Sequence, residues 1–239
     1  LLMSLSKRGW LMDRPNARSL HVAPTPRIGG LAMALGVATG LSLQGWVSPI
    51  IVLASCLCAL SVLDDWRGLS PVIRLLVHLA VASALVLTVL PDRAPWVSAA
   101  LVVLIVWMTN LYNFMDGADG LAGGMAIFGF GSYAIASWTA GDPSLAGSCA
   151  VIAMAALGFV AFNFPPARVF LGDAGSIPLG FLAGGIGLLG WSREYWPIWF
   201  PVAVFAPFVL DATVTLTRRV LAGERVWHAH RSHYYQRLV

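Results

Sequence analysis

The sequence predicts an all-α, polytopic membrane protein, and three observations lead to that prediction. The chain of 239 residues is 58% hydrophobic and only 11% charged, whereas soluble domains are about 25% charged. Its mean hydropathy is +0.77, so it carries more apolar surface than a core of this size can bury. No alternating ten-residue strand pattern is present, and helices then satisfy the backbone hydrogen bonds within lipid.

Charged or Pro/Gly-rich breaks divide the apolar sequence into helices. Residues 28–63 carry no charge but are too long for one crossing, and SLQGWVSP at 42–49 provides a turn between the first two helices. The later breaks are DDWRGLSPVIR, PDRAP, LYNFMDGADGLA, AGDPS, NFPPARVFLGDAG and SREYWP. We therefore expect about eight helices of roughly 15–20 residues, against roughly 20 for a bilayer crossing. They lie at about 28–45, 48–63, 75–90, 96–110, 123–139, 145–162, 176–191 and 197–216 of a single membrane domain, 1–239.

The distribution of basic residues predicts the orientation of the chain. If the chain crosses the membrane at each helix, one set of loops carries 13 of the 15 Lys and Arg residues, and the opposite set carries only Arg93 and Arg193. The positive-inside rule makes the richer set cytoplasmic. The paired aspartates and a histidine-rich tail fall on the same side, so we expect the functional site to face the cytoplasm. Because the arginines are scattered over several loops, nucleic acid is not expected as a partner.

The cysteines and the start of the chain add little. Cys56, Cys58 and Cys149 lie inside apolar runs, as small buried hydrophobic residues do, and neither a disulfide framework nor a zinc site is indicated. No cleavable signal peptide is visible, because Lys7 and Arg8 interrupt the first apolar patch. The chain begins without Met, which suggests a fragment.

Asp64 and Asp65, in VLDDWRGLSP, form the first polar cluster. Adjacent carboxylates repel each other and are stabilised by a cation, a proton or an arginine, and Arg67 or Arg74 could serve. The alternative is a hydrated helix end with a salt bridge. Ionisable groups at membrane depth are usually functional, which favours a site.

The stretch NLYNFMDGADGL is the second cluster. Asn110, Asn113 and Asp116 recur every three residues, so a helical turn places them on one face. Asp119 continues the spacing, although neighbouring glycines loosen the helix. Glycines beside carboxylates allow a ligand such as a diphosphate to approach the backbone closely. The alternative is a polar turn between two helices.

FNFPPARVFLGDAGSIPLG, at 162–180, is the third cluster. Its two prolines end a helix, and Arg168 offers a planar fork that suits phosphate. Asp173 lies in a glycine-flanked turn before the next apolar helix, where it either caps that helix or binds a metal. Hard oxygen ligands from separate loops suit Mg²⁺, which retains waters and combines few protein carboxylates with substrate phosphates.

The tail HAHRSHYYQRL is the fourth cluster. His228, His230 and His233 could bind zinc, but no Cys or Glu completes the set. A basic clamp on diphosphate, with Arg231, agrees better with the composition. The alternative is a tail that only lies at the membrane interface.

The N-terminal segment DRPNARSLHVAPTPRIGG surrounds its basic residues with Pro-rich turns. These residues are Arg14, Arg18, His21 and Arg27. The segment either folds over an anionic ligand or holds lipid headgroups, and the sequence leaves both open.

In this order, the four clusters resemble the polyprenyl-phosphate N-acetylhexosamine-1-phosphate transferases of glycosyltransferase family 4, which include the phospho-MurNAc-pentapeptide translocase. The resemblance rests on DDWRGLSP, NLYNFMDGADGLAGG, FNFPPARVFLGDAGS and HAHRSHYYQRL and extends from about Arg14 to Leu238. RPNARSLHVAPTPRIGG and HRSHYYQRL further resemble the branch that initiates O-antigen and capsular chains. Family members usually have ten or eleven transmembrane helices, so the resemblance implies truncation at both ends.

The resemblance implies a reaction in the inner (cytoplasmic) membrane of a bacterium. Undecaprenyl phosphate would attack the β-phosphorus of a UDP-amino sugar, releasing UMP and leaving undecaprenyl-diphospho-sugar. Mg²⁺, or Mn²⁺, and arginines would screen the two anions, so that positioning and charge stabilisation supply most of the catalysis. The sequence does not determine which UDP-sugar is used. It does not determine the oligomeric state either, and a homodimer is one of the alternatives.

The resemblance also implies roles for particular residues. Asp173, Asn113 and Asp116 would bind Mg²⁺ and diphosphate, and Asp64 or Asp65 would position or deprotonate the lipid phosphate. Asp119 would face the nucleotide. To these we add Asn110, Arg74 and Arg168 as substrate-binding residues, with His228, His230 and Arg231 as the clamp on diphosphate or sugar.

Two other classes of membrane protein agree less well with the sequence. CDP-alcohol phosphotransferases are also membrane-bound and rich in Asp-Gly pairs, but DGADGLAGG lacks their following arginine, and the next acid, Asp142, falls across the membrane. A transporter or channel would carry charges in mid-helix and polar groups towards both faces. Only Asp211, Arg74 and His78 approach that pattern, and the outer face is bare.

Overall fold

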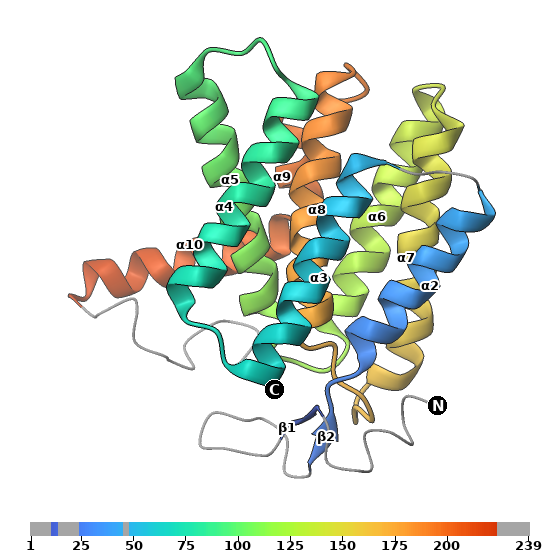
Figure 1. Ribbon diagram of the computed structural model, residues 1–239, viewed down its shortest axis with the longest axis vertical. Helices are drawn as coiled ribbons and strands as arrows, with labels where there is room; N and C mark the ends of the chain where they lie inside the picture. The colour runs from blue at the N-terminus through green and yellow to red at the C-terminus, as the bar shows by residue number, and fades with distance from the viewer. Residues whose placement is uncertain (1–10, 14–23, 45–47, 224–239) are drawn as a thin grey trace.

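The computed structural model describes residues 11–13, 24–44 and 48–223. Within that part of the chain, six helices are long and apolar enough to cross a membrane, which confirms the all-α, multi-span class. The long helices run side by side in a bundle (Figure 1). The helices of the described residues are α2 (Gly29–Leu43), α3 (Pro49–Arg67), α4 (Pro71–Val89), α5 (Pro95–Met115), α6 (Leu121–Thr139), α7 (Pro143–Asn163), α8 (Asp173–Ser192), α9 (Trp199–Val204) and α10 (Ala206–Leu221).

The ends of the helices follow from local chemistry. Helices α3, α4, α5 and α7 each begin at a proline, whose missing N–H costs nothing in a first turn. The hydroxyl of Ser70 and the carboxylate of Asp142 accept a backbone N–H at the starts of α4 and α7. Several helices are longer than predicted, because the polar residues used as boundaries, such as Asp64 and Asn113, belong to their last turns.

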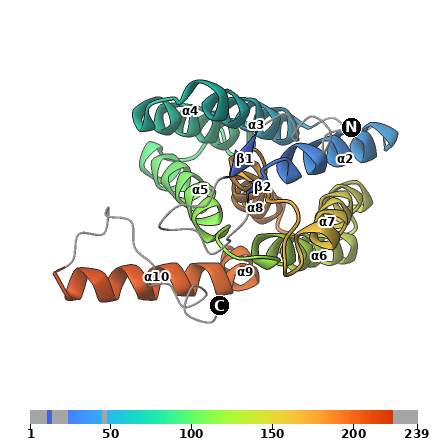
Figure 2. The same ribbon diagram turned by 90° about the horizontal axis from the view of Figure 1, so that it is seen from below.

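The predicted continuous helix at 197–216 is wrong. The helix breaks at Phe205, which separates the six-residue α9 from α10, and α10 extends sideways from the bundle (Figures 1 and 2). Pro207 lies in the first turn of α10 and cannot donate to a carbonyl of the preceding turn, so the chain restarts a helix there in a new direction. The helix predicted at about 28–45 is present as α2, which has 15 residues. A helix of that length is too short to cross a bilayer upright.

Helix α8 occupies the centre of the bundle (Figure 2). In its most apolar window 83% of the residues are buried, against 22% in α3. Glycines allow this close packing: a Cβ at Gly180 would lie 2.7 Å from the Cβ of Tyr112 and 2.8 Å from the carbonyl oxygen of Met108 on α5. The start of α8 is therefore surrounded by the ends of neighbouring helices.

A small hairpin lies at one end of the bundle. Strands β1 (Met12–Asp13) and β2 (Thr25–Pro26) pair antiparallel, an element that the helical periodicity did not predict. The α3–α4, α5–α6 and α7–α8 connections lie at the same end (Figure 1). This end carries Arg27, Arg67, Arg74 and Arg168, so it is the end predicted to face the cytoplasm.

Candidate active site

Asp173 is the first residue of the central helix α8. The preceding Gly172 has a φ of +70°, a conformation that favours glycine and turns the chain sharply into the helix. The free N–H groups and dipole of a helix N-terminus favour negative charge. One carboxylate oxygen of Asp173 lies 4.0 Å from the Nη1 of Arg74 on α4, so α4 and α8 meet at this point.

The paired aspartates at the end of α3 have different environments. One oxygen of Asp64 accepts the backbone N–H of Leu69 at 2.7 Å, and the other accepts Nη1 of Arg74 at 3.0 Å. Asp64 therefore closes the end of α3 and orients Arg74. Asp65 is exposed, and its carboxylate lies close enough to Asp173 for the two charges to repel each other. Of the pair, Asp65 is the carboxylate that a ligand reaches most directly.

The end of α5 brings Asn113 and Asp116 to the same place. The Oδ1 of Asn113 accepts a hydrogen bond from the Oγ of Ser176, in the first turn of α8, at 2.8 Å. Asp116, which follows α5, is partly buried, and burial raises its pKa well above the ordinary value. The carboxylate of Asp173 raises that pKa further, while Arg27 lowers it. Ser176 was not predicted as a site residue, although it is the last residue of the FNFPPARVFLGDAGS motif.

The side chains of Asp173, Asn113 and Asp116 have the chemistry of Mg²⁺ ligands. The donors are carboxylate and amide oxygens, the ligands that Mg²⁺ prefers, and the repulsion around Asp116 is of the kind that a cation removes. Within the described ranges, no three His, Cys, Asp or Glu side chains converge on one metal position. The arrangement therefore suits an ion held by one or two carboxylates and completed by substrate phosphates and water.

Asn163, at the end of α7, ties two loops of this site together. Its Oδ1 accepts the backbone N–H of Gly120 at 2.8 Å, and its Nδ2 donates to the carbonyl of Val169 at 2.9 Å. Asp119 makes a parallel link, since its carboxylate accepts the N–H of Ala167 at 2.8 Å. Both side chains thus hold the α5–α6 connection against the segment that leads to Asp173. A role for Asp119 towards a nucleotide stays a prediction.

Replacement of Asn163 by alanine is expected to lower stability, because it leaves two backbone groups without partners in a buried position. The cost is roughly 1–3 kcal/mol for each group. Thermal unfolding in detergent measures it. Asn110→Ala is the matched control, because Asn110 is exposed and its amide only donates to Val106 of its own helix. Equal melting temperatures for the two variants would contradict the proposed tie.

The remaining predicted residues are not drawn into this cluster by any described contact. Asn110 bonds within α5 at 2.7 Å. Arg168 donates to the carbonyl of Ala161 at 3.1 Å and lies over the ring of Phe162, so its guanidinium is directed at the end of α7. His228, His230 and Arg231 lie outside the described residues, as do Arg14, Arg18 and His21.

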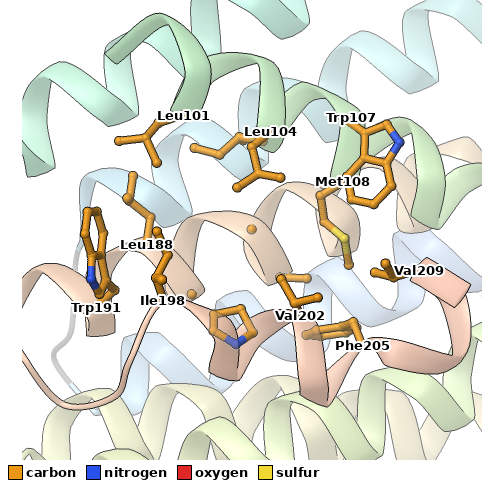
Figure 3. Close-up of a pocket in the computed structure, with 15 residues that line it drawn as sticks. Leu101, Leu104, Trp107, Met108, Leu188, Trp191, Ile198, Val202, Phe205 and Val209 are labelled. Carbon is orange, nitrogen blue, oxygen red and sulfur yellow. The ribbon is translucent and has the colours of Figure 1, made fainter. Parts of the chain in front are cut away.

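An apolar cleft lies between α5, α8 and the α9–α10 segment (Figure 3). Its lining is almost entirely hydrocarbon, with two tryptophans and no charged side chain. The residues labelled in Figure 3 are Leu101, Leu104, Trp107, Met108, Leu188, Trp191, Ile198, Val202, Phe205 and Val209. Thr109 and Asn110 directly follow Met108, so α5 joins the cleft to the polar cluster at Asn113.

Fold and site together define a multi-span membrane protein whose acidic and basic side chains gather at one end of the helical bundle. The model of glycosyl transferase family 4 matches residues 47–190, and the chain belongs to that family. The family recognised from the four sequence clusters is thereby confirmed.

Three relatives illustrate the similarity. A probable undecaprenyl-phosphate N-acetylglucosaminyl 1-phosphate transferase of Bacillus subtilis is 32% identical over 95% of this chain and 69% of its own length. A decaprenyl-phosphate N-acetylglucosaminephosphotransferase of Mycobacterium tuberculosis is 28% identical over 98% of this chain and 70% of its own. A phospho-N-acetylmuramoyl-pentapeptide-transferase of Staphylococcus saprophyticus is 35% identical over 59% and 45%, respectively.

Proposed function

We propose that this protein transfers an N-acetylated amino-sugar 1-phosphate from a UDP-sugar to undecaprenyl phosphate. An oxygen of the lipid phosphate forms a bond to the β-phosphorus, the bond from that phosphorus to the UMP oxygen breaks, and UMP leaves. The product, undecaprenyl-diphospho-sugar, would begin a cell-surface polysaccharide of the O-antigen type. The names of the relatives support the polyprenyl-phosphate acceptor and the amino-sugar phosphate.

One observation carries the proposal: carboxylates from three separate helix ends lie near enough to the start of α8 to influence one another electrostatically. They are Asp65 of α3, Asp116 after α5 and Asp173 of α8, with Arg74 of α4 beside them. Such a set would hold Mg²⁺ at the end of a membrane bundle, and the cation would offset the repulsion between a lipid-bound anion and a soluble anion that meet there. We infer that this end faces the cytoplasm of a bacterium, because the UDP-sugar is made there and the basic residues favour that side.

The chain's own residues have distinct tasks in this proposal. Asp64 fixes Arg74 at 3.0 Å, and Arg74 is then held where it can attract the acceptor phosphate. Asp65 lies beside that phosphate and positions it. Asp173, Asp116 and Asn113 would hold Mg²⁺, which, when bound, neutralises charge on the diphosphate. Asn110, Asp119, Arg168, His228, His230 and Arg231 remain proposed contacts to nucleotide or sugar.

The apolar cleft supports the lipid half of the proposal. Moving a polyprenyl chain from lipid to an apolar protein surface changes its free energy little, because both surroundings are hydrocarbon. An apolar cleft that opens to the bilayer can therefore hold such a chain at little cost. The cleft between α5, α8 and the α9–α10 segment has this character. We propose that the first isoprene units lie along it, with the phosphate towards Asn113.

A transport function is less well supported by the charge positions. Among the described residues of the six long helices, the aspartates lie only in the first or last turns, as Asp64, Asp65 and Asp173 do. Mid-helix acids that would carry protons across the bilayer are not seen there. The catalytic reading therefore accounts for more of the polar side chains.

The test is a direct assay of the reaction. The protein is incubated in proteoliposomes with undecaprenyl phosphate, Mg²⁺ and a panel of UDP-sugars that includes GlcNAc, GalNAc, FucNAc and QuiNAc. UMP release is expected for at least one of them, to depend on the lipid acceptor, and to stop when Mg²⁺ is chelated. No turnover of any UDP-sugar would contradict the proposed reaction and favour transport.

A further inference from the structure

Arg27 lies in an N-terminal segment that the proposed reaction does not use. The backbone of this segment is hydrogen-bonded to Phe170, in the α7–α8 connection that leads to Asp173. The N–H of Phe170 donates to the carbonyl of Pro26 at 2.8 Å, and the carbonyl of Phe170 accepts the N–H of Gly29 at 2.9 Å. Arg27 is thus held between two backbone hydrogen bonds and cannot move independently of the start of α8.

The side chain of Arg27 crosses the turn before α8. A Cβ at Gly172 would lie 3.3 Å from the Cβ of Arg27, so the stem of the arginine packs directly over that glycine. The charge of the guanidinium acts on three carboxylates, those of Asp65, Asp116 and Asp173. Arg27 is therefore a cation placed among the same acids that surround the proposed Mg²⁺ position.

A second contact orients the guanidinium. Its Nη2 donates to the Oδ1 of Asp13, on β1, at 2.9 Å. Among the described residues, the guanidinium of Arg27 makes this one side-chain hydrogen bond, and a guanidinium has five N–H donors. Most of the fork is therefore not taken up by the part of the chain that the structure describes. The side chain of Arg27 is 41% exposed, which gives a solute from the aqueous side access to those donors.

The position of Arg27 differs from that of Arg74. Arg74 lies in the first turn of α4, a membrane-crossing helix, and its guanidinium is paired with Asp64. Arg27 lies outside all the crossing helices, in the connection between the hairpin and α2. Of the two arginines, Arg27 is therefore the better placed for a phosphate that arrives from water, and Arg74 for a phosphate anchored in lipid.

We propose that Arg27 is a substrate-binding residue that donates hydrogen bonds to a phosphate oxygen of the nucleotide sugar. The inference rests on the proposed function. A diphosphate that approaches three carboxylates is repelled unless positive charge faces it, and Arg27 supplies that charge together with a fork that matches phosphate oxygens. Asp13 keeps the fork in place before the donor binds.

The test separates the donor from the lipid acceptor. Arg27→Gln is expected to raise the KM for the UDP-sugar about tenfold, as expected for loss of a hydrogen bond to a charged group, with little change in the KM for undecaprenyl phosphate. Arg27→Lys keeps the charge but loses the fork, so it is expected to restore part of the loss. Calorimetric titration of UDP-sugar with Mg²⁺, without acceptor, is expected to show the same tenfold loss of affinity in Arg27→Gln.

Arg93→Gln is the matched control. It removes the same charge from an exposed position at the opposite end of the bundle, over Trp191. Its two KM values are expected to equal those of the wild type.

Each other outcome overturns the inference. A rise in the KM for undecaprenyl phosphate alone would assign Arg27 to the lipid phosphate. An unchanged KM for the UDP-sugar would show that Arg27 does not bind the nucleotide sugar. A lower kcat and a lower melting temperature, with both KM values unchanged, would show that Arg27 has a structural role. In these cases the wild-type enzyme still releases UMP, so the proposed reaction stands. Absence of UMP release from the wild type would instead contradict the reaction itself.

Discussion

Replacement of Asp173 by asparagine is expected to abolish Mg²⁺-dependent UMP release. Asn keeps the shape of the side chain and one oxygen, but it removes the negative charge at the point where α4 and α8 meet. Loss of one charge-stabilising group of this kind lowers turnover by roughly two to three orders of magnitude. The measurement is UMP release at saturating UDP-sugar and undecaprenyl phosphate over a series of Mg²⁺ concentrations.

A loss of folding is distinguished from a loss of chemistry by the melting temperature. Asp173 repels the carboxylates of Asp65 and Asp116, so its neutralisation is not expected to destabilise the bundle. Mg²⁺ with UDP-sugar is expected to raise the melting temperature of the wild type and to leave that of Asp173→Asn unchanged. Asp92→Asn, an exposed aspartate at the opposite end, is the control and keeps full activity. Full activity in Asp173→Asn would exclude it from the metal site.

Replacement of Gly30 by alanine is expected to reduce both stability and activity. Gly30 of α2 packs against the backbone of Gly175 in α8, and an added Cβ would overlap that backbone and lie 2.7 Å from the carbonyl carbon of Ala174. A backbone cannot rotate out of the way, so the two helices must separate. Overpacking of this kind costs about 1–3 kcal/mol, or roughly 3–10 °C in melting temperature.

The loss of activity follows from position. Ala174 directly follows Asp173, so a shift between α2 and α8 moves the carboxylate relative to Asp65 and Arg74. Misplacement by about 1 Å can lower a rate roughly a hundredfold. Gly36→Ala is the control on the same helix, because its Cβ would meet Ala155 at an ordinary 3.7 Å. If Gly36→Ala destabilised the protein as much as Gly30→Ala, the contact between Gly30 and the backbone of Gly175 would not be the cause of the loss.

Periodicity and charge predicted the bundle well, and the failures have a common cause. The helix at 197–216 was expected to be continuous because apolar composition hides a break, yet Pro207 removes the hydrogen bond that continuity needs. The hairpin of β1 and β2 was missed because two-residue strands carry no period. Composition over a long window does not report single backbone groups.

The structure brings part of the predicted candidate site together, and the roles of its residues stay predictions. Asn113, Asp116 and Asp173 were taken from separate clusters, and the structure brings them around the start of α8. Asn163 and Ser176 were not singled out, since one reads as a helix end and the other as a small residue in a transmembrane helix. For Arg168, contact with phosphate stays a prediction, and its described contacts are with the carbonyl of Ala161 and the ring of Phe162.

The sequence by itself determined that this chain is a helical membrane protein of glycosyl transferase family 4, with its polar residues concentrated at one end of the bundle. It did so because hydrophobicity, charge bias and short motifs are properties of neighbouring residues. Only the tertiary structure decided that Asp64 is occupied by Arg74 while Asp65 is exposed, and that Arg27 crosses the turn before Asp173. Those relations depend on which residues from distant segments meet, and such meetings depend on how α2, α3, α4 and α8 pack together.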